Sequence, residues 1–218
     1  MRTRASLVLL LLVGLVAPAA HASPSDRTCR LVRDAVDDVQ QDITTKVRQG
    51  PPSRALDIIN GDIAADVRAL TIIIRLAGPV KADAYSPTGF AYSFRFTIDA
   101  GDRPQRFELN ADIGPASQTY SLLRYDETAG FSGVGMYVHG SLDSSRQAIR
   151  ITADMSQIQA MAQGALQHPD GHRLHDFEIV SGTSTGEQSV AYVNITGDDV
   201  AYGARPTKIG TASCIKPG

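Results

Sequence analysis

An isoleucine-rich stretch, residues 56–76, constrains the fold of this chain more than any other feature. Side chains that branch at Cβ are stiff at χ1 and pack well on a pleated surface, so this composition favours strands over helices. We expect a short strand, a turn near Asn60-Gly61, and then a long strand. One face of that long strand carries Leu70, Ile72, Ile74 and Leu76.

The clearest strict alternation in the chain follows in residues 90–98. Aromatic and aliphatic side chains occupy every second position, and smaller or polar ones lie between them. An aromatic stripe of this kind suits a ligand platform or a core, and we favour the core because the opposite face is the polar one. The stripe consists of Phe90, Tyr92, Phe94, Phe96 and Ile98.

Short strands separated by turn signals continue to the end of the chain and predict an all-β fold. We expect a two-sheet antiparallel β-sandwich of the jelly-roll or immunoglobulin-like kind. One short helix is predicted near residues 154–163, with Asp154 as its N-cap. Residues 30–48 fit a second helix, or a strand that is followed by an acidic turn.

The first 22 residues have the composition of a secretory signal peptide. Arg2 and Arg4 precede an apolar run, and Ala20-His21-Ala22 forms a small-x-small cleavage site. We therefore expect export to the cell exterior or the cell wall, and a single mature domain over residues 23–218. No later apolar run reaches the roughly 20 residues that a membrane span requires.

Charge is nearly balanced, with 21 basic and 23 acidic residues, and no basic run is present. A nucleic-acid partner therefore has little support. The chain has two cysteines, Cys29 and Cys214, near the ends of the predicted mature domain. In an exported protein we expect them to pair, which would join the two ends of the fold.

Short motifs near both ends resemble a group of uncharacterised bacterial secreted domains. They are Cys29 with Val32-x-Asp34-x-x-x-Asp38, Leu56-Asp57-Ile58, and the C-terminal Ala212-Ser213-Cys214-Ile215. That group is similar to DOMON and family-9 carbohydrate-binding-module β-sandwiches. The resemblance implies a sandwich fold, and the wider group contains sugar-binding and haem-binding members.

Three carboxylates, those of Asp34, Asp38 and Asp57, are predicted to gather at one end of the sandwich, where Asp198 and Asp199 would join them. Calcium takes six to eight oxygen ligands and suits such a set outside the cell. Turn and cap aspartates that bond to nearby N–H groups explain the same residues without a metal.

Two further patterns suggest chemistry. The loop His168–His175 holds three imidazoles and could ligate zinc or copper, although Pro169 and Gly171 favour a solvated loop. Residues 182–186 fit the G-x-S-x-G pattern of a serine hydrolase, but a strand is predicted after it where the hydrolase elbow requires a helix.

We predict from these features a secreted, non-enzymatic binding module of the cell envelope, stabilised by calcium if the acidic site forms. Its partner would be a polysaccharide or an envelope protein. The alternative is a structural or accessory envelope protein without a small-molecule ligand. A hydrolase or metalloenzyme is a third interpretation, for which no convergent acid, base and nucleophile are visible.

Overall fold

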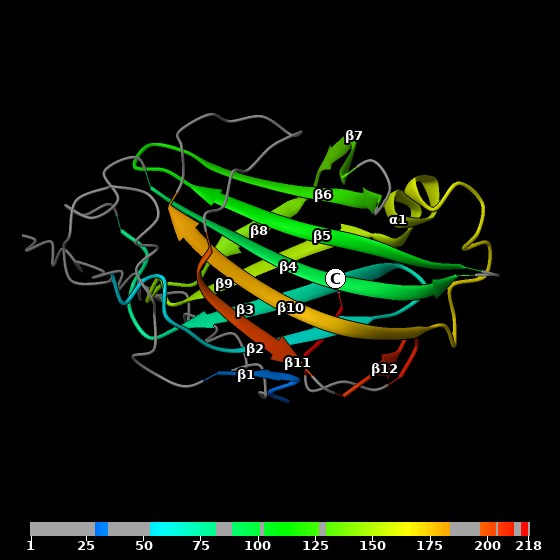
Figure 1. The fold of residues 1–218 in the computed structure, drawn as a ribbon, viewed down its shortest axis with the longest axis horizontal. Coiled ribbons are helices and arrows are strands. Elements are labelled where there is room, and N and C mark those ends of the chain that lie inside the picture. Colours follow the sequence, from blue (N-terminus) through cyan, green and yellow to red (C-terminus); the bar gives the residue numbers. More distant parts are fainter. Residues whose placement is uncertain are drawn as a thin grey trace, which may run out of the picture.

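The structure, a computed structural model, describes residues 29–34, 53–81, 89–100, 103–126, 130–183, 197–203, 205–211 and 215–217. The predicted signal peptide and most of the segment 30–48 lie outside these ranges. The elements, in chain order, are β1 (Val32–Arg33), β2 (Ile58–Ala65), β3 (Ala69–Leu76), β4 (Phe90–Ala100), β5 (Arg103–Ile113), β6 (Gln118–Asp126), β7 (Gly130–Tyr137), β8 (His139–Leu142), β9 (Ala148–Asp154), α1 (Met155–Met161), β10 (Arg173–Thr183), β11 (Gly197–Gly203) and β12 (Thr207–Lys208) (Figure 1).

All of these strands pair antiparallel, which confirms the predicted all-β fold. They form one hydrogen-bonded path in the order β7-β6-β5-β4-β10-β11-β1-β2-β3-β9-β8, and β12 adds to β10. Figure 1 shows a front layer of β4, β5, β6, β10 and β11 with β2, β3, β8 and β9 behind it. Two separate sheets are not confirmed, because β1 bonds to both β11 and β2 and makes the layers continuous.

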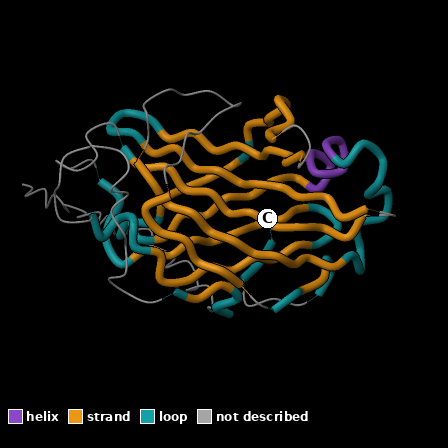
Figure 2. The backbone as a smooth tube through the Cα atoms, in the orientation of Figure 1, coloured by secondary structure: helices purple, strands orange, loops and turns teal. Residues whose placement is uncertain are grey.

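The sheet is nearly closed and barrel-like, because one run of chain reaches both ends of the strand order. β7 pairs with β6, and after Val138 the chain continues as β8, which pairs with β9. The N–H of Val138 donates to the carbonyl oxygen of Tyr120 at 3.1 Å, which holds this crossing in place. The smooth trace in Figure 2 shows the strands wrapping round a shared interior.

The aromatic stripe of β4 fills that interior, as the alternation predicts. Phe90, Tyr92, Phe94, Phe96 and Ile98 are all fully buried. The Phe94 ring meets the ring of Phe177 edge-on, with 6.2 Å between the ring centroids. Phe96 stacks on Phe107, with 5.8 Å between the ring centroids. Such aromatic pairs are worth about 1 kcal/mol each beyond the area that they bury.

The predicted turn near Asn60-Gly61 is wrong. β2 runs straight through these residues, and the turn comes later, where Asp66 Oδ1 accepts the N–H groups of Arg68 (2.7 Å) and Ala69 (2.9 Å). Gly61 serves close packing instead: a Cβ there would lie 2.2 Å from Ile179 Cδ1. The glycine therefore lies at a close contact between the two layers rather than in a turn.

The predicted short helix is confirmed as α1. Asp154 precedes it, and the N–H of Asp154 donates to Gln157 Oε1 at 3.0 Å. Its buried side chains are Met155, Ile158 and Met161. Among the described residues, no helix has the length and apolar composition needed to cross a membrane.

Both ends of the described chain pack on the same face of β2. Asp62 Oδ2 accepts the N–H of Cys29 at 3.2 Å, and Ile215 packs on Ala64 and Ile73. Cys214 lies outside the described residues, so the Cys29–Cys214 bond stays a prediction. Its two flanking segments are nevertheless held on neighbouring positions of one strand.

Candidate functional site

The predicted calcium ligands fall on neighbouring segments of the sheet. Asp34 follows β1, where its N–H approaches the carbonyl oxygen of Ile59 at 3.4 Å, and Asp57 is buried just before β2. Asp199 pairs with Ser181, whose hydroxyl donates to the carbonyl oxygen of Leu56 at 2.5 Å. The backbone therefore brings these three segments to one region.

The calcium site itself stays a prediction. Asp38 lies outside the described residues, and for Asp198 and Asp199 only the backbone is described. Within the described part of the chain, no group of three His, Cys, Asp or Glu side chains is arranged to hold a metal ion.

Two of the three histidines of the 168–175 loop, His172 and His175, bond to oxygen atoms of the protein. His175 Nε2 lies 2.8 Å from Asp99 Oδ1, and its Nδ1 lies 2.8 Å from Asp176 Oδ2. His172 Nδ1 contacts the backbone oxygen of Asp99. Gly182 and Thr183 of the G-x-S-x-G pattern lie in β10, and the rest of that pattern is outside the described residues.

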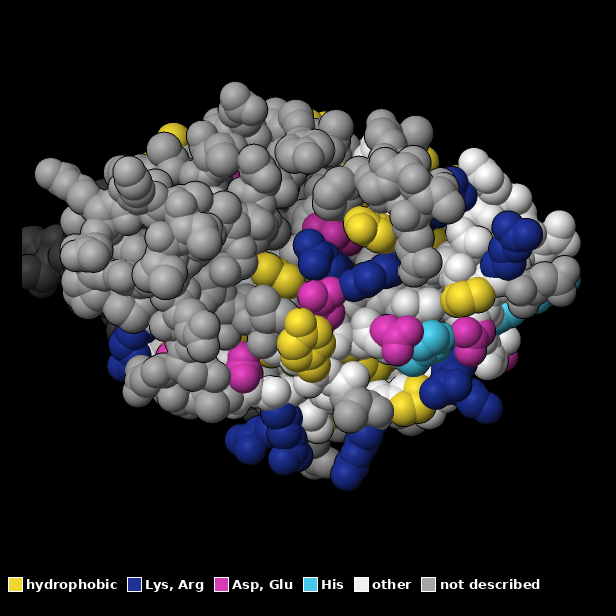
Figure 3. All heavy atoms as spheres, viewed as in Figure 1, with side chains coloured by type: hydrophobic (Ala, Val, Ile, Leu, Met, Phe, Trp, Pro, Cys, Tyr) yellow, Lys and Arg dark blue, Asp and Glu magenta, His cyan; other side chains and the backbone are white. Residues whose placement is uncertain are grey.

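The surface best suited to binding is the side of the front layer that faces away from the core, which we call the outer face. It consists of the outward side chains of β4, β5, β6, β10 and β11, opposite the buried aromatic stripe. Pairing register places these side chains in rows that cross the strands at right angles. Figure 3 shows basic, acidic and hydrophobic side chains side by side on this face.

The central row of the outer face joins an exposed aromatic ring to a chain of charges. Tyr202 of β11 is 68% exposed and lies directly opposite Glu178 of β10. The row reads, strand by strand, Arg33, Tyr202, Glu178, Arg95, Glu108 and Leu123.

Ion pairs hold this central row. Arg95 Nε donates to Glu108 Oε2 at 3.0 Å, and Arg95 Nη1 lies 3.5 Å from Glu178 Oε2. Burial works against the charge on Arg95, but the two adjacent carboxylates outweigh it and raise the pKa of the guanidinium. Arg106 Nη2 also donates to Glu178 Oε2, at 2.6 Å. Shared partners give the row fixed side-chain positions.

A cavity of about 560 Å³ lies over the next row, which runs His175, Thr97, Arg106 and Tyr125. The Arg106 guanidinium lies 5.3 Å from the centre of the Tyr125 ring, in cation–π geometry. The other lining residues are Arg103, Pro104, Gln105, Arg124, Gln163 and Asp176. The cavity thus offers guanidinium donors, amides and an aromatic ring together.

The row on the other side of the charges is polar and buried. It places Ser93, Asn110 and Ser121 on adjacent strands and ends at Tyr137, which is 62% exposed. Both amide atoms of Asn110 and the hydroxyl of Ser93 are buried and have no hydrogen-bond partner among the residues that the structure describes. A buried polar group left unpaired costs about 1–3 kcal/mol, so an ordered water that bonds to these atoms would stabilise the fold.

Comparison with known proteins does not assign this chain to a family. No protein-family model, no curated protein and no solved structure matches this chain. The resemblance to DOMON and family-9 sandwiches therefore stays a prediction.

Sequence reasoning missed the outer face, although one signal was present. Arg95 stands five residues before Ala100, and Glu108 stands five residues after Arg103. Because Ala100 and Arg103 pair at the end of the hairpin, the register pairs Arg95 with Glu108 directly. No local sequence pattern indicated that Tyr202 would lie beside these charged residues. Its partner β10 is reached only through the long-range pairing of Phe177–Gly182 with β11.

Proposed function

We propose that this chain is an exported carbohydrate-binding module that holds a polysaccharide on its outer face. The observation that carries the proposal is the central row, where exposed Tyr202 stands beside a fixed series of charged hydrogen-bonding side chains. Sugars present apolar C–H faces that stack on aromatic rings, and hydroxyls that bond to charged and amide groups.

One neighbouring feature supports the proposal. Tyr125 and Arg106 in the cavity add a second aromatic and guanidinium pair. The groups lie on strands of one sheet, so their side chains lose little conformational freedom on binding.

The alternative of a structural envelope protein has weaker support. A protein-docking face of that kind would carry a contiguous apolar patch. In the described part of the chain, the exposed large hydrophobic side chains are Val67, Tyr137 and Tyr202, which lie on different elements. The mixed polar and aromatic outer face therefore favours the sugar-binding interpretation.

Titration calorimetry with soluble polysaccharides tests the proposal. The probes are dextran, methyl-esterified polygalacturonate, polygalacturonate and hyaluronate. We expect saturable binding of at least one polymer. Tyr202→Ala should weaken it by about 1 kcal/mol, or roughly fivefold, because a stacking contact of that size is lost.

Two variants serve as controls for this titration. Tyr202→Phe keeps the ring and should bind nearly as well as the wild type. Val67→Ala removes an exposed apolar side chain in the turn between β2 and β3 and should change nothing. The absence of binding to all four polymers would reject the proposed function.

A further inference from the structure

We infer that the polysaccharide is acidic, and that a cluster of cations beside the outer face binds its carboxylates. This inference rests on the proposed function and specifies its ligand class. We call the cluster the basic edge. It consists of Arg30, Arg33, Arg173, Arg205 and Lys208, all of which are exposed.

The cations of the basic edge lack acidic partners, unlike the arginines that form ion pairs in the sheet. Arg75, Arg95 and Arg106 each pair with a carboxylate at 3.0 Å or less. Among the described residues, none of the five cations of the basic edge has a carboxylate within ion-pair distance. The whole chain nevertheless has a net charge of −2, so these cations do not merely follow an overall excess.

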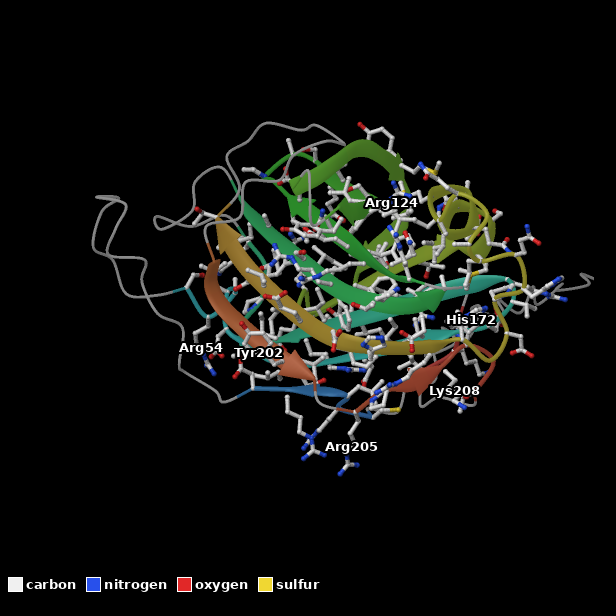
Figure 4. The ribbon with its side chains drawn as sticks, turned by 45° about the vertical axis from the view of Figure 1, so that its right-hand side comes forward. Arg54, Arg124, His172, Tyr202, Arg205 and Lys208 are labelled. Carbon is white, nitrogen blue, oxygen red and sulfur yellow. The ribbon has the colours of Figure 1, made fainter. Side chains whose placement is uncertain are left out.

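Strand pairing places like charges together at the basic edge. Arg173 of β10 and Lys208 of β12 are directly opposite each other in the register. Like charges directly opposite each other destabilise a sheet. Figure 4 shows Arg205 and Lys208 projecting from the same margin of the molecule. A bound polyanion would turn this repulsion into attraction.

The basic edge is continuous with the stacking residue of the proposed site. Arg33 is directly opposite Tyr202, which brings their Cβ atoms to about 5 Å. Tyr202 lies on the same side of the molecule as Arg205 in Figure 4. A sugar ring stacked on Tyr202 would therefore place its next charged neighbours beside the basic edge.

An acidic polysaccharide fits this surface better than a nucleic acid. A nucleic-acid strand carries one charge per 3.4 Å, and Glu178 and Glu108 stand in the same row as Tyr202. Those carboxylates would repel a densely charged phosphate chain. Sugar acids also present hydroxyls, which can donate hydrogen bonds to the carboxylates of the row, so the mixed row suits them.

Calorimetric titration with matched polymers tests the inference. Polygalacturonate and its methyl-esterified form share a backbone and differ in charge, and hyaluronate provides a second polyanion. We expect the wild type to bind polygalacturonate or hyaluronate at least about tenfold more tightly than the esterified polymer, and to lose this preference as salt rises.

Variants then assign the charge dependence to the basic edge. The triple variant Arg173→Ala, Arg205→Ala, Lys208→Ala should lose the preference for the acidic polymers and keep its binding of the esterified form. The control is Arg68→Ala, Lys81→Ala, which removes exposed cations elsewhere and should bind like the wild type. Thermal melting confirms that each variant is folded.

The outcomes separate the two proposals. Equal binding of charged and esterified polymers, or an unchanged triple variant, would overturn the acidic ligand and leave the carbohydrate module intact. Binding to none of the polysaccharides would overturn both. Tighter binding to phosphatidylglycerol vesicles than to either polyanion, lost in the triple variant, would assign the basic edge to a lipid surface and reject the inference.

Discussion

Asp62 connects the N-terminal segment to the sheet through one buried carboxylate. Its two oxygens accept the N–H groups of Cys29 and Leu31, each at 3.2 Å. Its Oδ2 also accepts from Arg75 Nη1 at 2.7 Å, and Arg75 reaches Asn60 Oδ1 at 2.8 Å as well. Three donors thus depend on one side chain that is fully buried.

Asp62→Ala should therefore destabilise the protein by about 3 kcal/mol, because it leaves Arg75 without its carboxylate and two backbone N–H groups without an acceptor. Urea unfolding measures this difference. Asp170→Ala, which removes an exposed carboxylate, is the control and should cost little. An Asp62→Ala midpoint equal to that of the control would contradict the assigned role.

At the scale of single elements, Gly61 is the residue that sequence reasoning misread. Its position opposite Ile179 Cδ1 makes a specific prediction. Gly61→Ala should cost about 2 kcal/mol, because the new methyl group overpacks the contact between the layers. Thermal or urea unfolding provides the measurement.

A companion substitution tests the cause. Ile179→Val removes the Cδ1 atom that the new methyl group would meet, at a cost of its own of about 1 kcal/mol. In that background, Gly61→Ala should cost clearly less than it does in the wild type. Equal costs in both backgrounds would show that the glycine is needed for another reason.

The Asp143 carboxylate accepts hydrogen bonds in the turn between β8 and β9, and the stability that it adds depends on pH. Burial alone would raise its pKa, but hydrogen bonds from the Ser145 hydroxyl and from the N–H groups of Ala148 and Gln147 lower the pKa below its ordinary value of 3.8. A lowered folded-state pKa adds stability above the unfolded value, and this stability is lost as pH falls through the folded value.

Asp143→Asn keeps an acceptor at Oδ1 and does not titrate. We expect the wild type to be the more stable of the two at pH 7, with the difference shrinking as pH falls below about 4. Urea unfolding at a series of pH values measures it. A difference that stays constant down to pH 2 would show that the carboxylate charge does not matter.

Local periodicity carried the element predictions that proved correct. The strict alternation of Phe90–Ile98 identified core residues, and Asp154 marked the start of α1. Periodicity could not show that the opposite side of β4 is also largely buried, as Ser93 and Thr97 are. It could not separate a turn glycine from a packing glycine either, because that depends on a residue more than a hundred positions away.

For the whole molecule, the unpredicted feature is closure of the sheet. Closure depends on Val138. The strand before it, β7, pairs with β6, and the strand after it, β8, pairs with β9. No local sequence pattern specifies this change of pairing partner, since β7 and β8 both have ordinary strand sequences. The outer face depends on a second long-range pairing, because residues 95, 106 and 178 meet only when β10 lies beside β4.

The central claim is that the outer face of the front layer binds polysaccharide. Amide hydrogen exchange with and without the polysaccharide that binds most tightly in the titration tests it most directly, since it locates the ligand without any substitution. We predict slower exchange in β10, β11 and β12, and unchanged exchange in β3 and β9 of the back layer. Slower exchange confined to β3 and β9, or none anywhere at saturating polymer, would contradict the claim.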